Sequence, residues 1–290
     1  MKKKILFIIN PISGVGKHQI AEKLVTENLD HKNFDYEFAY TKAAKHAIEL
    51  SKKATEENFD VVVAVGGDGS VNEIGKSLVK TKTALAILPC GSGNGTARHL
   101  RIPVNLKKAM MVINRMKIKS IDTFCVNEET VINIAGIGYA AHIAREFSGF
   151  GKRGFSNYIK IALRDMWKYK SQICEIEFDG KKFERTAFII DICNGTQWGN
   201  NAVIAPHAKN DDGLLDIYII NDFPFYIFPV MATRLFTRSI HRSGYVEIYR
   251  VKEIIIRQEK SYAHLDGEPT ETGNELKVKI NPGSLKMIVP

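Results

Sequence analysis

Three short apolar segments, each running directly into a glycine-rich turn, limit most strongly what this chain can fold into. They are residues 5–9, 61–65 and 85–88, and a helical pattern follows each turn. Continuous apolar runs of this length are typical of strands buried on both faces of a parallel sheet. The repeated strand-helix order predicts a doubly wound α/β domain whose strand-to-helix turns share one edge, where such sheets bind ligands.

The residue pattern differs between the two halves of the chain. In the first half we expect helices at 18–29 and 105–116, a strand at 36–40, and Thr41 as the cap of a helix ending near Glu57. After Asp122, period-two segments predict a mainly antiparallel body of the sandwich or barrel type. The strands expected there are 172–178, 183–193, 214–220, 245–258 and 275–280, and the helices are 156–169 and 226–238.

This change of pattern places a domain boundary near residues 120–127. We expect residues 1–122 to form the α/β domain and residues 123–281 to form a β-rich second domain. The final residues, 282–290, are candidates to rejoin the first domain.

The composition narrows the class of protein. A formal net charge of +9 indicates attraction to an anionic partner, such as nucleic acid, an acidic lipid surface or phosphorylated small molecules. The four cysteines occur singly, without metal-ligand spacing, which favours a reduced intracellular protein. The basic start lacks a cleavage site after its short apolar run, and no apolar stretch approaches the about 20 residues that span a bilayer.

The first glycine turn reads Asn10-Pro11-Ile12-Ser13-Gly14-Val15-Gly16-Lys17. Pro11 stands where a Walker loop has its first glycine, and His18 replaces the Ser or Thr after the lysine, which argues against a P-loop NTPase. A glycine turn with a lysine at a helix start still suits an anion. A tight turn without any ligand is the alternative.

The second turn, Gly66-Gly67-Asp68-Gly69-Ser70, carries an acid among three glycines. The glycines let the backbone approach a ligand and direct several N–H groups toward it. Asp68 would repel bare phosphate, but it suits ribose hydroxyls or a Mg²⁺ ion on the phosphates. A purely structural turn rarely needs three glycines around an acid, so we expect a nucleotide site.

The third turn, residues 89–98, again joins an apolar strand to a helix and contains the neutral donors Ser92, Asn94 and Thr96. Together the three turns outline a cradle for a nucleoside triphosphate. The expected nucleotide-binding residues are Asn10, Ser13, Gly14, Lys17, Thr41, Gly66, Gly67, Asp68, Gly69, Ser70, Asn72, Glu73, Gly91, Ser92, Gly93, Asn94 and Thr96.

These motifs resemble those of the diacylglycerol kinase catalytic domain superfamily, which includes bacterial soluble lipid kinases and sphingosine kinases. Residues 66–73 resemble its GGDGTxNE signature, residues 89–98 its P-x-G-[ST]-x-N-x-x-A-R loop, and residues 10–14 its opening NPxSG. Residues 121–122, 133–138, 212–216 and 265–268 follow in family order, so the resemblance spans nearly the whole chain. It implies an ATP-dependent lipid kinase with a lipid kinase-like α/β domain.

The resemblance also implies where the remaining chemistry lies. Asp266 and Glu268 would meet the turn at residues 66–70, with Asp266 as general base and Glu268 as a Mg²⁺ partner, or with these roles reversed. Asp212 and Asp216 would hold a structural Mg²⁺ and connect to Asp122 through polar contacts. Without the family, Asp266-Gly267-Glu268 is simply a hairpin turn.

Two departures from the family pattern concern the substrate. Ser70 stands where threonine is commoner, which is chemically mild. Gly95 occupies a place often held by aspartate in the bacterial diacylglycerol kinases, while sphingosine-kinase-like members also lack that acid. The identity of the lipid is therefore open, whereas phosphoryl transfer is not affected.

Other motifs have structural explanations. Gly136-x-Gly138-x-x-Ala141 imitates a dinucleotide fingerprint, but no acid follows at the required spacing, so close packing explains it better. The histidines show no metal-ligand spacing. Two segments, 223–231 and 155–169, combine aromatic residues with nearby cations and suit contact with an anionic membrane; ordinary core packing is the alternative.

The expected function is an ATP- and Mg²⁺-dependent lipid kinase, with diacylglycerol favoured over a sphingoid base or another long-chain alcohol. NAD kinase and a non-catalytic nucleotide sensor are the more distant alternatives. We expect a cytoplasmic protein that acts transiently at the inner face of the membrane and does not bind nucleic acid. A homodimer is the default expectation for such an enzyme.

Overall fold

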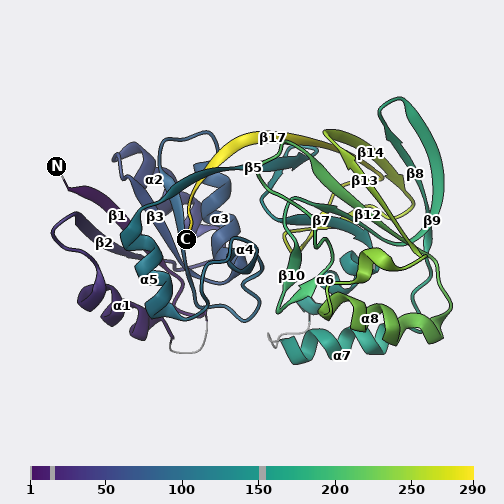
Figure 1. Cartoon of the computed structure of the whole chain (residues 1–290), viewed down its shortest axis with the longest axis horizontal. Coiled ribbons are helices and arrows are strands. Elements are labelled where there is room, and N and C mark those ends of the chain that lie inside the picture. Colours follow the sequence, from purple (N-terminus) through teal and green to yellow (C-terminus); the bar gives the residue numbers. More distant parts are fainter. Residues whose placement is uncertain (1, 14–16, 150–154) are drawn as a thin grey trace. The chain divides into compact units, whose positions relative to one another are not determined.

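The computed structural model describes residues 2–13, 17–149 and 155–290. The chain divides into two compact units (Figure 1). The first unit contains Met1–Asp122 and Gly283–Pro290, and the second contains Thr123–Pro282. None of the helices in the described residues is long and apolar enough to cross a membrane.

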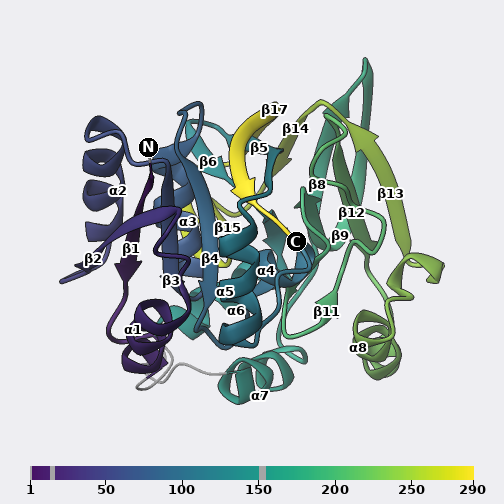
Figure 2. The same cartoon turned by 60° about the vertical axis from the view of Figure 1, so that its left-hand side comes forward.

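The first unit is a parallel sheet with helices on both faces. Its strand order is β2-β1-β3-β4, and the last residues of β17 lie beside β4, with Met287 opposite Leu85. Helices α1 and α5 pack together, as do α2 and α3, on opposite faces of the sheet (Figures 1 and 2). The elements are β1 (Lys3–Ile9), α1 (Lys17–Asn28), β2 (Phe34–Tyr40), α2 (His46–Glu56), β3 (Val61–Gly66), α3 (Asp68–Leu78), β4 (Ala84–Pro89), α4 (Gly95–His99), α5 (Leu106–Arg115), β5 (Ile118–Val126) and β17 (Glu275–Ile288).

This topology confirms the doubly wound α/β fold expected from the apolar runs. Every residue of β3 and β4 is buried, as a strand covered on both faces requires. The strand order reverses between β1 and β3, which is the point where open α/β sheets bind ligands. The turns after these two strands therefore lie where the sequence placed its nucleotide cradle.

The prediction that Thr41 caps α2 is wrong. The helix begins at His46 with Lys45 as its N-cap residue. The Thr41 N–H instead donates to the Ile9 carbonyl oxygen at 2.9 Å, so Thr41 continues the pairing of β2 with β1. A residue held in a strand ladder cannot open a helix, and four residues of loop separate it from α2.

The second unit is a mainly antiparallel β-sandwich, as the period-two segments predicted. Its strands follow the order β16-β15-β7-β9-β8-β14-β17, and β12 pairs with both β9 and β13. The elements are β6 (Glu129–Val131), β7 (Ile134–Gly138), α6 (Tyr139–Gly149), α7 (Phe155–Asp165), β8 (Gln172–Phe178), β9 (Lys181–Cys193), β10 (Gln197–Gly199), β11 (Ala202–Val203), β12 (Leu215–Asn221), η1 (Phe225–Ile227), α8 (Phe228–Phe236), η2 (Ile240–Arg242), β13 (Val246–Val251), β14 (Glu253–Gln258), β15 (Tyr262–Leu265) and β16 (Glu268–Glu271).

The C-terminal part of β9, residues 189–193, is buried on both faces because its alternate residues enter two different cores. Ile190 and Ile192 pack among the strands, whereas Ile189 and Cys193 pack in the core that includes residues of α6, α7 and α8. The expected strand at 245–258 is two strands, β13 and β14, which part at Lys252. Helix α6 was not expected from the sequence.

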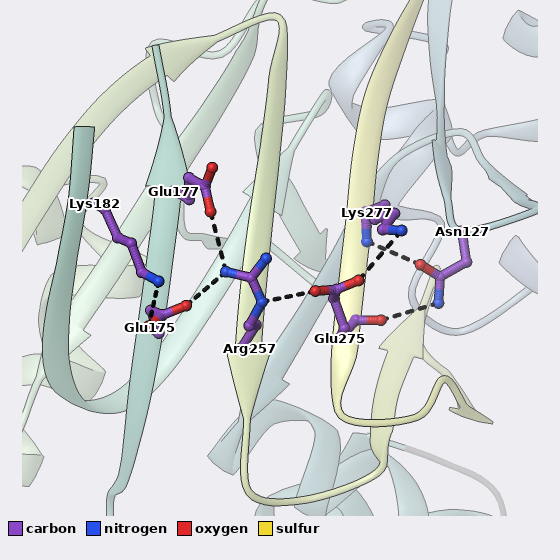
Figure 3. Close-up of polar contacts among 7 residues, drawn as sticks. All are labelled: Asn127, Glu175, Glu177, Lys182, Arg257, Glu275 and Lys277. Carbon is purple, nitrogen blue, oxygen red and sulfur yellow. Dashed lines mark hydrogen bonds and ion pairs between the residues drawn. The ribbon is translucent and has the colours of Figure 1, made fainter. Parts of the chain in front are cut away.

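An ion-pair network lies across one surface of the second unit (Figure 3). Arg257 of β14 pairs with Glu175 and Glu177 of β8 and with Glu275 of β17 at 2.6–3.1 Å. Lys182 and Lys277 extend the network to β9 and along β17. Single exposed pairs contribute little, but a shared guanidinium with three carboxylates helps to set the register of these strands.

Candidate active site

The turn after β1 reaches the turn after β3 at the edge where the strand order reverses. The Asn10 N–H donates to the Val65 carbonyl oxygen at 3.2 Å, and Asn10 Nδ2 donates to Ser70 Oγ at 3.4 Å. Ser13 Oγ lies 4.0 Å from the position that a Cβ would take on Gly67. The structure therefore brings residues of the first two predicted turns together.

The second and third turns touch through their backbones. The N–H groups of Cys90 and Gly91 both donate to the Gly66 carbonyl oxygen, at 2.9 and 3.2 Å. A Cβ on Gly91 would lie 2.4 Å from Gly67 Cα, a separation that real Cβ atoms do not show. Glycine is required at this contact because the neighbouring atoms belong to backbone and cannot rotate away.

Asp68 joins these two turns through its side chain. It is the first residue of α3, and its Oδ1 accepts the Thr96 N–H at 3.2 Å near the start of α4. A Cβ on Gly93 would lie 2.9 Å from Asp68 Oδ2. Burial raises the pKa of the Asp68 carboxyl, while the N–H groups at residues 94–96 oppose that shift. Its role toward ribose or Mg²⁺ remains a prediction.

Two candidate residues on α3 have different surroundings. Asn72 is buried, and its Oδ1 has no hydrogen-bond partner within the part of the chain that the structure describes. Glu73 Oε1 accepts the Lys45 N–H at 3.1 Å, which supports the loop before α2. Asn72 is therefore the better placed of the two for a ligand, because a buried acceptor without a partner is costly.

The other candidates at this edge are less constrained. Ser92 and Gly69 are exposed, and Asn94 Nδ2 donates to the Gly91 carbonyl oxygen at 2.7 Å. Gly14 lies outside the described residues. Lys17 begins α1, but its side chain is likewise outside the description.

In the second unit, Asp266 and Gly267 form the two-residue turn of the β15–β16 hairpin. Both have positive φ, of 52° and 86°, as a type I′ turn requires. The Asp266 carboxylate accepts three backbone N–H groups: Ile132 on Oδ2 at 3.0 Å, and Asn133 and Ile134 on Oδ1 at 2.8 and 3.1 Å. The carboxylate is thus held against the start of β7, whereas Glu268 is exposed.

A buried polar network that the sequence analysis missed lies beside this hairpin. His264 Nε2 lies 3.4 Å from Asp191 Oδ1, and Trp198 Nε1 donates to Asp191 Oδ2 at 2.7 Å. A Cβ on Gly136 would lie 1.9 Å from Asp191 Oδ1, so glycine leaves room for this pair. The available signal was Asp191 itself, the one charged residue in the apolar segment 187–193.

The candidate structural-metal residues have a cationic partner from the protein. Arg250 pairs with Asp212, and its Nε lies 3.5 Å from Asp216 Oδ1. Asp216 is buried, and its Oδ2 has no hydrogen-bond partner among the described residues. Those residues contain no group of three or more His, Cys, Asp or Glu placed to hold a metal. The Arg250 guanidinium balances the negative charge of Asp212 and Asp216, which Mg²⁺ was expected to balance. The structural Mg²⁺ itself remains a prediction.

Replacing Arg250 by glutamine should destabilise the protein mainly at neutral pH. Burial raises the pKa of Asp216 and Arg250 opposes that shift. An acid whose pKa is higher in the folded than in the unfolded chain gains folded-state stability as the pH falls through that pKa. We expect a loss of about 1–3 kcal/mol at neutral pH, toward the lower end because Arg250 is partly exposed, that shrinks at acidic pH.

Urea unfolding of both proteins across this pH range would measure the difference. If Arg250 alone balances the two carboxylates, EDTA leaves the wild-type unfolding free energy unchanged. A stability loss in EDTA that Mg²⁺ reverses would instead show that the two carboxylates hold a metal beside Arg250.

Asp122, the last residue of the first segment of unit one, is buried and accepts the Gly283 N–H at 2.7 Å. This bond joins the two points at which the chain leaves and re-enters that unit. Asp122 therefore has a structural partner within its own unit. Its expected connection to Asp212 and Asp216 remains a prediction.

Comparisons with known proteins agree with the fold and the motifs. Residues 4–126 match the diacylglycerol kinase catalytic domain, and residues 133–289 match the YegS C-terminal NAD kinase beta sandwich-like domain. A diacylglycerol kinase of Bacillus subtilis is 30% identical over 280 residues, covering 92% of this chain and 90% of the relative. A "Probable lipid kinase YegS-like" of Chromohalobacter salexigens is 29% identical over 250 residues, covering 84% and 80%.

Solved structures show the same fold. A crystal structure described as a diacylglycerol kinase of Bacillus anthracis aligns with a TM-score of 0.75 at 22% identity, covering 99% of this chain and 97% of the other. A second structure from that organism gives a TM-score of 0.82 at 23% identity. The chain belongs to the diacylglycerol kinase catalytic domain superfamily, together with the YegS-like lipid kinases and bacterial diacylglycerol kinase.

Proposed function

We propose that the protein transfers the γ-phosphoryl group of ATP to the hydroxyl of a membrane lipid, with diacylglycerol as the first choice of acceptor. The observation that carries this proposal is the backbone contact of the second and third glycine turns at the switch point of the sheet, closed by Asp68 on Thr96. Such backbone-lined turns at strand ends suit a triphosphate. The similarity to lipid kinases supports the acceptor class.

The transfer has three chemical requirements. The lipid oxygen forms a bond to the γ-phosphorus while the bond to the oxygen bridging the β- and γ-phosphorus breaks, and ADP leaves. The proton of the lipid hydroxyl must pass to a base. Mg²⁺, when bound, would neutralise the charge on the phosphates. From the resemblance alone, we propose Asp68 and Glu268 as the carboxylates that would hold Mg²⁺.

The proton acceptor is proposed to be Asp266. Its three backbone bonds give it a fixed position, as a general base needs. The same bonds occupy most of its acceptor positions, and the exposed Glu268 has more freedom. The reversed assignment, in which Glu268 takes the proton, is therefore the alternative that the variants must distinguish.

A labelled-transfer assay tests the function. The protein is incubated with γ-labelled ATP, Mg²⁺ and mixed micelles carrying a panel of diacylglycerol, sphingoid base and long-chain alcohol, with NAD in a parallel reaction. We expect Mg²⁺-dependent label in diacylglycerol. Label only in NADP would replace the lipid kinase by an NAD kinase, and nucleotide binding without label in any acceptor would favour a sensor.

The proposed reaction also requires contact with a bilayer, because a long-chain acceptor does not leave it. The net charge of +9 is consistent with an anionic membrane surface at the inner face of the membrane. A homodimer is proposed only as the default for such an enzyme.

A further inference from the structure

The segment from Phe223 to Val246 has an unusual charge pattern. It contains no Asp or Glu, although Asp222 and Glu247 flank it. Its basic residues are Arg234, Arg238, His241 and Arg242, and its aromatic residues are Phe223, Phe225, Tyr226, Phe228, Phe236 and Tyr245. The segment includes η1, α8 and η2 of the second unit. A stretch of this length without an acid keeps its positive charge uncompensated by its own residues.

The aromatic end of this segment joins a second one on the surface. The rings of Phe225 and Trp167 lie 4.5 Å apart between centroids. Trp167, Phe225 and Tyr226 are 64%, 56% and 66% exposed. Leu163 of α7 and Val230 of α8 add further exposed apolar surface. The two segments that the sequence offered separately for membrane contact therefore form one aromatic edge, with α7 and α8 at the same end of the unit (Figures 1 and 2).

A groove of about 540 Å³ continues from this edge along α8. Its apolar end is lined by Pro229 and Val230, and its polar end by Arg234, Thr237 and Arg242. The Arg234 guanidinium donates a long hydrogen bond to the Ser239 carbonyl oxygen at 3.4 Å. No carboxylate within the described residues pairs with Arg234 or Arg242. The groove therefore offers two guanidinium groups to an anion.

We propose that this groove binds the phosphate of an anionic phospholipid while the edge of Trp167, Phe225 and Tyr226 enters the bilayer interface. Guanidinium groups are matched to phosphate oxygens. Exposed aromatic rings beside cations suit the boundary between headgroups and acyl chains. A soluble phosphate alone would not account for the aromatic edge, and an apolar protein partner would not account for the cations. The proposed lipid kinase function explains why the protein would dock on a membrane, and the inference rests on that function in this respect only.

Tryptophan fluorescence can test the docking directly, without ATP. The chain has two tryptophans, and Trp198 is held by Asp191, so Trp167 should report on insertion. We expect a blue shift of the emission with vesicles of phosphatidylcholine and phosphatidylglycerol, and none with phosphatidylcholine alone. The shift should disappear in Trp167→Phe. Equal shifts with the anionic and the neutral vesicles would overturn the proposal, because binding would then not depend on the anionic headgroup.

Charge variants separate the groove from the general basicity of the protein. Arg234→Gln with Arg242→Gln should weaken partitioning onto the anionic vesicles about 30-fold, from the usual contribution of two basic residues near such a surface. Lys181→Gln with Lys252→Gln removes the same charge from exposed positions elsewhere in the unit and should leave partitioning close to wild type. Equal losses in both pairs would overturn the groove as the site.

A control variant guards against a folding defect, and two further measurements exclude other occupants of the groove. Arg234→Lys with Arg242→Lys keeps the charge and should keep part of the binding, which guards against a folding defect. Inorganic phosphate that displaces the protein from vesicles at micromolar levels would make the groove a free-phosphate site and overturn the lipid assignment. A dimer in sedimentation that the glutamine pair dissociates, without lipid, would assign the face to a second copy and also overturn it.

Turnover on a short-chain diacylglycerol in solution distinguishes this inference from the proposed function. The glutamine pair should keep that turnover and lose turnover on vesicles. Absence of turnover on any acceptor, with vesicle binding intact, would remove the kinase proposal while leaving the docking face in place.

Discussion

Asp266→Asn is expected to lower turnover about 10²–10⁴-fold, the usual effect of removing a general base. Asparagine tolerates the positive φ of this position, and Asn-Gly suits the same type I′ turn, so the hairpin should keep its backbone. The side-chain amide, however, would present N–H₂ to one of the three backbone N–H groups that the carboxylate now accepts. One unpaired N–H costs about 1–3 kcal/mol, so stability should fall as well.

Two variants separate chemistry from folding. Asp179→Asn makes the same change in the β8–β9 turn, where Asp179 and Gly180 also have positive φ, and should alter neither stability nor turnover. Glu268→Gln should raise the Mg²⁺ requirement if Asp266 is the base. If Glu268→Gln instead abolishes the acid limb of the pH–rate profile while Asp266→Asn retains it, the roles are reversed. Near-normal turnover in both Asp266→Asn and Glu268→Gln would show that the β15–β16 hairpin takes no part in the reaction.

Gly91→Ala is expected to damage nucleotide binding and stability together. The new Cβ would lie 2.4 Å from Gly67 Cα and 3.0 Å from Asn94 Oδ1. Since the nearest atom is backbone, the second and third turns must separate, at a cost of about 1–3 kcal/mol for an overpacked site. We expect ATP affinity to fall about tenfold or more, equivalent to about 1.4 kcal/mol. Urea unfolding and calorimetric titration with ATP would measure the two effects.

Gly244→Ala is the matched control for this change. Its Cβ would have no heavy atom within 4 Å, and its φ lies outside the left-handed region. The unfolding free energy should stay within about 0.5 kcal/mol of wild type. An unchanged ATP affinity in Gly91→Ala, with stability reduced, would show that the contact of the two turns supports the fold but not the nucleotide.

Local patterns predicted the elements well where a single period dominates. The buried strands β1, β3 and β4 and the alternating strand β8 lie where their apolar patterns placed them. Predictions were wrong where a distant partner decided the outcome. Thr41 resembles a helix cap, but its N–H bond to the Ile9 carbonyl oxygen of β1 holds it at the end of the β1–β2 pairing. Residues 245–258 alternate continuously, yet the chain parts at Lys252 because β13 pairs with β12 and β14 with β8 and β17.

The candidate site shows the same division. The motifs placed Gly66, Gly67 and Gly91 in turns at one edge of the sheet, because parallel strands carry their carboxyl ends to a common edge. Their spacing did not show that the second and third turns touch through backbone. It also did not show that Asp266 is held by the start of β7, or that Arg250 pairs with Asp212 and Asp216. These contacts join residues far apart in sequence.

The sequence by itself determined the family, the two fold classes and the glycine turns, because strand periodicity, turn chemistry and signature spacing are local properties. Only the tertiary structure decided which groups lie together: the Asp68 carboxylate with the Thr96 N–H, Trp167 with Phe225, and Arg234 and Arg242 along one groove beside α8. Such meetings depend on how separate elements pack, and no local period encodes the distance between two side chains on different elements. The functional proposals therefore take the type of chemistry from the sequence motifs and the location of the interacting side chains from the packing of the elements.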